Sequence, residues 1–113
     1  MANINSVVLI GRLTRDVELR VTPSGVSVAN ITLAVDRVPG KDGNKETDFI
    51  DCVLFGKTAE ATSRYCGKGK LVGIEGRIQV RNWEANDGSK RKSVEVICDN
   101  IQFLSPRDKD TED

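Results

Sequence analysis

The sequence predicts an all-β domain, a barrel of five strands with one short helix between the third and fourth strands. Two observations lead to this fold. Most apolar residues alternate with polar ones, which is the period-two pattern of strands that bury one face. Only residues 57–66 change to a helical composition. The 113 residues suffice for one domain with a core, but not for two.

The first elements are a buried strand and a hairpin. Residues 4–13 form a dense apolar run, and Gly11 within it indicates a bulge or a close approach of another backbone. Residues 17–21 and 26–36 alternate and are joined by the turn sequence Thr22-Pro23-Ser24-Gly25. We therefore expect a hairpin whose second arm is long.

The strand at residues 49–56 has two different faces. Side chains alternate along a strand, so its members divide into two sets. One set is apolar and predicts a core face: Ile50, Cys52 and Leu54. The other combines two of the few aromatic rings with a carboxylate: Phe49, Asp51, Val53 and Phe55. The second set is unusual for a buried face and indicates a binding surface.

The segments on either side of this strand are a loop and a helix. Pro39, Gly40 and Gly43 predict a protruding loop at residues 37–48, whose lysines are placed to close over a strand of nucleic acid lying on the sheet. Residues 57–66 predict the helix, with Thr58 as its cap and Gly67 as its stop. Tyr65 at the helix end either fills the core or stacks on a ligand.

The second half of the chain repeats the two-faced pattern. Along residues 71–83 one face is apolar (Val72, Ile74, Ile78, Val80) and the other carries charge and an indole (Glu75, Arg77, Gln79, Arg81, Trp83). After a turn at residues 86–88 and a basic run at 90–92, residues 93–104 predict the last strand. Residues 105–113 are charged without apolar content, so we expect a folded domain at 1–104 and a disordered tail at 105–113.

Rings interleaved with cations on a sheet are typical of proteins that bind single-stranded nucleic acid. Unpaired bases offer flat faces for stacking, and phosphates offer negative charge. Net charge adds little, since 17 basic residues balance 17 acidic ones and the part before the tail is only +2. Asp51 and Glu75 do not fit this interpretation directly; they pair with neighbouring cations or set the register.

Several function classes are disfavoured by composition. The chain has no histidine, the usual general base and a common metal ligand, and it has no nucleophile and base motif, so we expect neither an enzyme nor a metal or cofactor site. Its three cysteines have no C-x-x-C spacing and are odd in number, which argues against disulfides; Cys52 and Cys98 fall on predicted core faces, so we expect buried free thiols in a reducing compartment. No run approaches the length of a membrane span and no leader is evident, so we expect a cytoplasmic protein that does not contact membranes.

The order of three strands, a helix and two strands is the connectivity of an OB-fold, a Greek-key barrel that binds oligonucleotides or oligosaccharides. Four blocks resemble the bacterial single-stranded DNA-binding proteins: V-V-L-I-G-R-L-T-R-D from Val7, V-A-N-I-T-L-A-V from Val28, D-F-I-D-C-V-L-F-G-K-T-A-E from Asp48 and I-E-G-R-I-Q-V-R-N-W from Ile74. They span nearly the whole folded region in the family's order.

This resemblance implies a homotetramer that binds single-stranded DNA without strong sequence preference during replication, recombination and repair. Bases would stack on Phe49, Phe55 and Trp83. Phosphates would contact basic residues: Arg12, Lys41, Lys45, Lys57, Arg77, Arg81, Lys90, Arg91 and Lys92. The protein would work in the bacterial cytoplasm or nucleoid, or in a phage-infected cell.

The sequence departs from the family's pattern at two places. The family commonly has a further aromatic residue near the start of the 37–48 loop, where this chain has Val38-Pro39, so one stacking partner is missing. The long tail with an acidic, Phe-ended tip is also missing, so we do not expect repair or replication enzymes to bind through it. The chain is either a natural short form, such as an accessory paralogue or a phage version, or a shortened form of a longer protein.

Two alternatives remain open. An OB-fold accessory or assembly factor that binds other proteins, and nucleic acid only weakly, agrees with the balanced charge and the missing ring. RNA could replace DNA, because stacking does not depend on the sugar and only a contact to the 2′-hydroxyl would discriminate.

Overall fold

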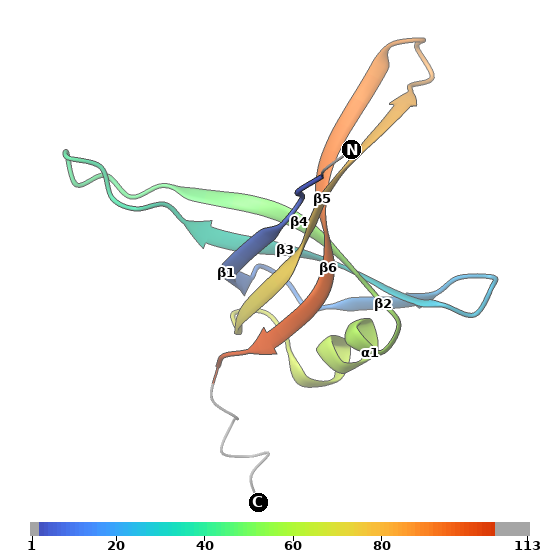
Figure 1. Cartoon of the computed structure of the whole chain (residues 1–113), viewed down its shortest axis with the longest axis horizontal. Helices are drawn as coiled ribbons and strands as arrows, with labels where there is room; N and C mark the ends of the chain where they lie inside the picture. The colour runs from blue at the N-terminus through green and yellow to red at the C-terminus, as the bar shows by residue number, and fades with distance from the viewer. Residues whose placement is uncertain (1–2, 106–113) are drawn as a thin grey trace, which may run out of the picture.

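The computed structural model describes residues 3–105, which form a closed barrel with one helix (Figure 1). In chain order the elements are β1 (Val7–Leu13), β2 (Glu18–Val21), β3 (Ser27–Asp36), β4 (Thr47–Phe55), α1 (Gly56–Tyr65), β5 (Leu71–Glu84) and β6 (Lys90–Phe103). The order around the barrel is β1, β5, β6, β4 and β3, and β1 closes it by pairing with β3. β2 extends β3 outside this ring.

The sequence prediction of the fold is confirmed. Five strands close the barrel, and α1 connects the third of them in chain order, β4, to the fourth, β5. The connectivity is that of an OB-fold. The closure requires Gly11, because a Cβ atom there would lie 2.7 Å from the carbonyl oxygen of Ala34, so the expected close approach is present.

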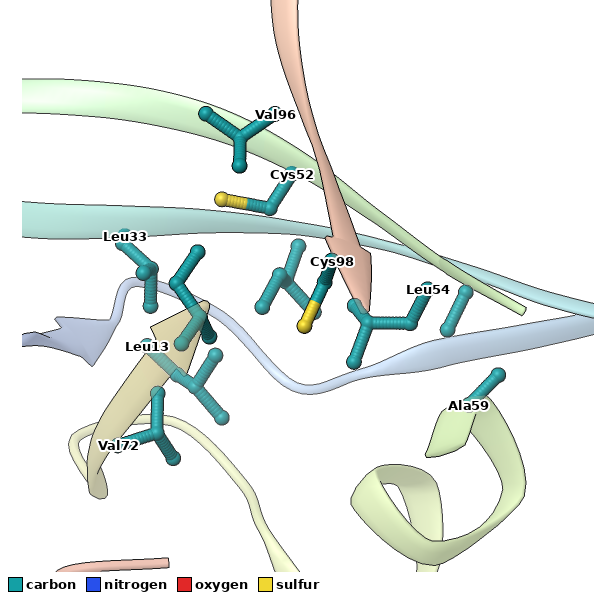
Figure 2. Packing of buried hydrophobic residues seen from close by; sticks show 11 residues of the cluster. Leu13, Leu33, Cys52, Leu54, Ala59, Val72, Val96 and Cys98 are labelled. Atoms are coloured by element: carbon teal, nitrogen blue, oxygen red, sulfur yellow. The ribbon is translucent and has the colours of Figure 1, made fainter. Parts of the chain in front are cut away.

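The core lies where the inward rows of the strands meet (Figure 2). Its buried members come from all five barrel strands and from α1, which covers one end with Ala59: Leu13, Ala29, Ile31, Leu33, Cys52, Leu54, Ala59, Val72, Ile74, Val96 and Cys98. Fully burying such an aliphatic side chain contributes about 1.5 to 3 kcal/mol, so this cluster is the main source of the barrel's stability.

Hairpins extend beyond the barrel where β5 pairs with β6, where β3 pairs with β4 and where β2 pairs with β3 (Figure 1). The β5–β6 pairing continues to Glu84 and Lys90, so β6 includes the basic run at residues 90–92, whereas the sequence predicts a strand that starts after it. The residues that continue the core-facing positions of β5 into this hairpin therefore lie outside the core. Ile78 and Val80 are among them and are 45% and 44% exposed.

β6 contains one bulge, at Asp99. Glu75 pairs with Asn100 and Gly76 pairs with Cys98, so Asp99 has no opposite residue in β5. A Cβ atom at Gly76 would lie 2.0 Å from the carbonyl oxygen of Ile97, and only glycine fits there. The extra residue also shifts the inward row of β6 by one position.

The helix starts earlier than the sequence predicts. α1 begins at Gly56, whose φ of 62° lets the chain turn directly out of β4, and Phe55 occupies the N-cap position without a side-chain cap. The prediction that Thr58 caps the helix is therefore wrong. Thr58 lies in the first turn, where its carbonyl accepts the hydroxyl proton of Thr62 at 2.7 Å.

Candidate nucleic-acid interface

β4 presents its two aromatic rings outward, because it is a strand with one face in the core. Cys52 and Leu54 are 1% and 0% exposed, whereas Phe49 and Phe55 are 68% and 45% exposed. Asp51 lies between the rings on the same face, and its Oδ1 accepts the hydroxyl of Thr32 at 2.9 Å. The carboxylate thus has a neutral partner on β3 and no cation is needed to hold it.

The β5–β6 hairpin presents the third ring. Trp83 is 49% exposed and lies opposite Arg91. Two residues earlier on β5, Arg81 lies opposite Ser93, and alternation puts it on the same face as Trp83. Glu75, at the base of this strand, accepts the side-chain amide of Asn100 at 3.3 Å, so it too has a neutral partner.

The pairings make the rings of β4 and the hairpin part of one sheet face, which we call the outer surface (the outward residues of β4, β5 and β6 from Phe49 to Trp83). β4 joins β6 through Val53 and Ile97, and Ile97 lies opposite Arg77 on β5. Val53 and Ile97 form, with Val28, a small buried cluster between the two halves of the surface. Of the three rings, Phe55 borders this cluster directly, because it lies opposite Val28 and two residues after Val53.

Each arginine of the hairpin's outer face has a carboxylate partner. The charged atoms are separated by 2.6 Å in Arg77–Asp99, 3.9 Å in Arg81–Glu95 and 3.9 Å in Arg91–Asp87. The partner of Arg77 is the bulged residue of β6. These pairs are exposed at least on the arginine side, and they leave the hairpin electrically close to neutral.

The loop between β3 and β4 is braced at its base. Arg37 donates to both carboxylate oxygens of Asp48, at 3.0 and 2.8 Å, and also contacts Glu46. The hydrogen bonds from Arg37 hold the pKa of Asp48 below its usual value. Next to this clamp, Thr47 donates its hydroxyl to Asp36 at 2.9 Å. The loop between β3 and β4, which we call the arm, therefore projects from the barrel in one direction.

Beyond the clamp the loop carries the two lysines that the sequence analysis selected. Lys41 and Lys45 are both exposed. Val38 is 90% exposed, so the position where the sequence lacks the extra ring is open to solvent and offers only a small apolar side chain.

Comparison with known proteins identifies the family. The model of the single-strand binding protein family matches residues 4–104. The chain belongs to this family. It is 55% identical over 102 residues to the single-stranded DNA-binding protein of Clostridium tetani, covering 89% of this chain and 70% of that protein. It is 50% identical over 105 residues to single-stranded DNA-binding protein 1 of Staphylococcus aureus, covering 92% of this chain and 63% of that one.

The remaining predicted cations of this single-strand binding domain do not all share the outer surface. Lys57 is exposed two residues after Phe55, in the first turn of α1. Lys90 and Lys92 lie opposite Glu84 and Asn82, on the face of the hairpin turned away from Trp83. Arg12 is at the far end of β1, where its guanidinium donates to the carbonyl of Gly69 at 3.0 Å. Because side chains alternate along a strand, the basic run, which is continuous in the sequence, is divided between the two faces of the hairpin.

Two aromatic residues outside the outer surface are also exposed. Tyr65 is 62% exposed. Of the two roles that the sequence allows for it, filling the core is therefore excluded. Its ring lies 6.2 Å from that of Phe103, which is 42% exposed and which sequence reasoning did not select. Phe103 lies within the last strand that the sequence predicts, two residues after Ile101, but the sequence did not mark its ring as exposed.

The thiols lie outside the outer surface. Burial raises the pKa of Cys52 to about 12 and that of Cys98 to about 11, so both stay protonated at neutral pH. Within residues 3–105 no three side chains of the metal-ligating types come together, and no helix there is long and apolar enough to cross a membrane.

Proposed function

We propose that this chain binds single-stranded DNA on its outer surface without strong sequence preference, and that Phe49, Phe55 and Trp83 are the stacking residues. The observation that carries the proposal is the exposure of all three rings, between 45% and 68%, on one sheet face, with Phe49 and Phe55 on the side of β4 opposite the core and Trp83 on the projecting hairpin. Rings so exposed contribute little to folding. A ligand with flat apolar faces would cover them.

Stacking accounts for the lack of sequence preference, since every base has a π-face. Each stacked base contributes about 1 to 3 kcal/mol. The buried cluster of Val28, Val53 and Ile97 joins the outer faces of β4 and β6 into one surface. The activity proposed is binding alone, in agreement with a family of DNA-binding proteins that are not enzymes.

Phosphates have two kinds of cationic partner. Within residues 3–105, Lys41, Lys45 and Lys57 have no carboxylate at ion-pair distance and are available for phosphate. The arginines of the hairpin are already paired, and a phosphate must compete with Asp87, Glu95 or Asp99. We therefore assign the lysines of the arm and of α1 to phosphate, with the arginines contributing less.

We infer that the chain assembles as a homotetramer in the bacterial cytoplasm or nucleoid and protects single strands during replication, recombination and repair. An open edge supports self-association. β1 pairs with β5 along its length but reaches β3 only at Arg12 and Leu13. Val8 and Ile10 on this strand are 69% and 58% exposed, and such an edge favours pairing with another copy.

The proposal is tested by titrating the protein with oligo-dT while following the fluorescence of Trp83. We expect saturable quenching that weakens with salt. Phe49→Leu, which removes a ring but keeps apolar bulk, should weaken binding roughly fivefold or more. Val21→Ala is the matched control, because Val21 is 64% exposed on β2, away from the outer surface. Equal affinities for Phe49→Leu and the parent protein would refute the stacking role.

A protein-binding OB module remains the second candidate, since the hairpin arginines are already neutralised by carboxylates. The same titration separates the two functions. No quenching at low salt, together with an unaltered Phe49→Leu variant, would support the second candidate. Oligo-U in place of oligo-dT measures the preference between RNA and DNA, and sedimentation with and without oligo-dT measures the assembly state.

A further inference from the structure

The end of the barrel covered by α1 carries a second group of exposed rings, which we call the helix pole (Arg64, Tyr65, Lys68 and Phe103). Tyr65 ends α1 and Phe103 ends β6, and these two ends lie side by side (Figure 1). The ring centroids are 6.2 Å apart with the planes inclined by 59°. Because the rings are 62% and 42% exposed, much of this aromatic area faces solvent.

The cations of the helix pole differ from those of the hairpin. The guanidinium of Arg64 lies 5.9 Å from the centre of the Tyr65 ring, in cation–π geometry. Within residues 3–105, neither Arg64 nor Lys68 has a carboxylate at ion-pair distance. The nearby Asp16 accepts the backbone N–H of Lys68 at 2.9 Å. The hairpin arginines, by contrast, each face a carboxylate.

α1 connects the helix pole to the outer surface. Phe55 immediately precedes the helix and Tyr65 is its tenth residue, which corresponds to about 15 Å along the axis. Lys57 and Arg64 are seven residues apart and therefore lie on the same side of α1. Glu60 shares that side, and one of its carboxylate oxygens accepts the hydroxyl of Ser27 at 2.9 Å. A chain leaving Phe55 would meet a cation at each end of the helix.

We propose that the helix pole is a second stacking site for the same single strand, in which one base stacks on Tyr65 or Phe103 and Arg64 and Lys68 contact the adjoining phosphates. The proposal rests on the function proposed above. The combination of open rings and unpaired cations fits a nucleic-acid strand, which supplies flat bases and phosphates in alternation.

The test compares two lengths of oligo-dT on the same variants, with Trp83 fluorescence as the readout. An oligomer of about 6 nucleotides fits on the outer surface alone, while one of about 20 can also reach the helix pole. Tyr65→Leu should bind the short oligomer like the parent protein and the long one roughly fivefold or more weakly. Tyr65→Phe keeps the ring and should match the parent protein at both lengths.

Photo-crosslinking gives a second, direct readout. A long oligo-dT that carries 5-iodouracil should form adducts at Tyr65 or Phe103 as well as at the rings of the outer surface. The adducts at Tyr65 should disappear in Tyr65→Leu. Circular dichroism of Tyr65→Leu checks that the barrel is unchanged.

The outcomes separate this inference from the proposed function. Normal quenching by both oligomers, with equal affinities for Tyr65→Leu and the parent protein and no adducts at the helix pole, would overturn the second site alone. Absence of quenching by the short oligomer in the parent protein would overturn stacking on the outer surface instead. A loss in Tyr65→Leu that Tyr65→Phe shares would also count against the inference, since the ring would then not be the group that matters.

Discussion

Asp99→Asn should strengthen the binding of single-stranded DNA while the barrel stays folded. Asp99 is the bulged residue of β6, and its carboxylate lies 2.6 Å from the guanidinium of Arg77. Both side chains are about half exposed, 51% for Arg77 and 56% for Asp99. An ion pair at such a site contributes about 0.2 to 1 kcal/mol to stability, so its loss leaves a folded barrel.

The expected gain follows from the charge that is released. With Asp99 neutral, Arg77 becomes available to one more phosphate. Each such contact to a single strand steepens the plot of log K against log salt by about 0.7. Taking the gain as negligible near 1 M salt, affinity should rise roughly threefold at about 0.2 M and roughly eightfold at about 0.05 M. These factors are upper limits, because the carboxylate also orients the guanidinium.

The assay is a salt series of oligo-dT titrations read by Trp83 fluorescence. Glu18→Gln is the matched control, since it removes the same charge from an exposed position on β2 that has no arginine partner within residues 3–105. It should shift affinity far less and leave the slope unchanged. An unchanged slope in Asp99→Asn, or an equal effect of Glu18→Gln, would show that the ion pair does not withhold Arg77 from phosphate.

Two further predictions concern the barrel itself. Gly76→Ala should lower stability by about 3 kcal/mol, because its Cβ would lie 2.0 Å from the carbonyl oxygen of Ile97. Gly73→Ala on the same strand is the control, since its Cβ would meet nothing closer than 3.4 Å. Thermal unfolding at equal protein concentrations compares the two variants, and equal midpoints would contradict the argument. Cys52 and Cys98, with pKa values raised by burial to about 12 and 11, should resist alkylation at pH 8 until the protein is unfolded, as mass spectrometry would detect, and rapid labelling of the native protein would contradict their burial.

Short-range alternation predicted the parts of the site that depend on one strand at a time. Phe49 and Phe55 face outward because Cys52 and Leu54 face the core, and this follows from a period of two in nine residues. The same period put Trp83 beside Arg81. The barrel order also followed from the sequence, since the helix between the third and fourth barrel strands distinguishes this fold from other small barrels.

What the sequence analysis missed depends on contacts between distant residues or on a break in the period. Asp99 lies 22 residues from Arg77, and no local pattern joins them. A signal for the bulge did exist, because the inward apolar positions of β6 change from even numbers at Val96 to odd numbers at Ile101. Lys90 and Lys92 were grouped with Arg91 because a run of charges conceals the strand that separates their faces.

The pairing of the arginines and the balance of the whole chain point to the same mechanism of binding. A domain that relied on phosphate contacts would carry a clear excess of unpaired cations, as strongly basic nucleic-acid binders do. Here 17 basic residues meet 17 acidic ones, and the arginines next to Trp83 are neutralised within the hairpin. Most of the affinity must then come from stacking. The salt dependence of oligo-dT binding should accordingly be shallower than the number of cations near the rings would suggest, and removing a ring should cost more than removing an arginine.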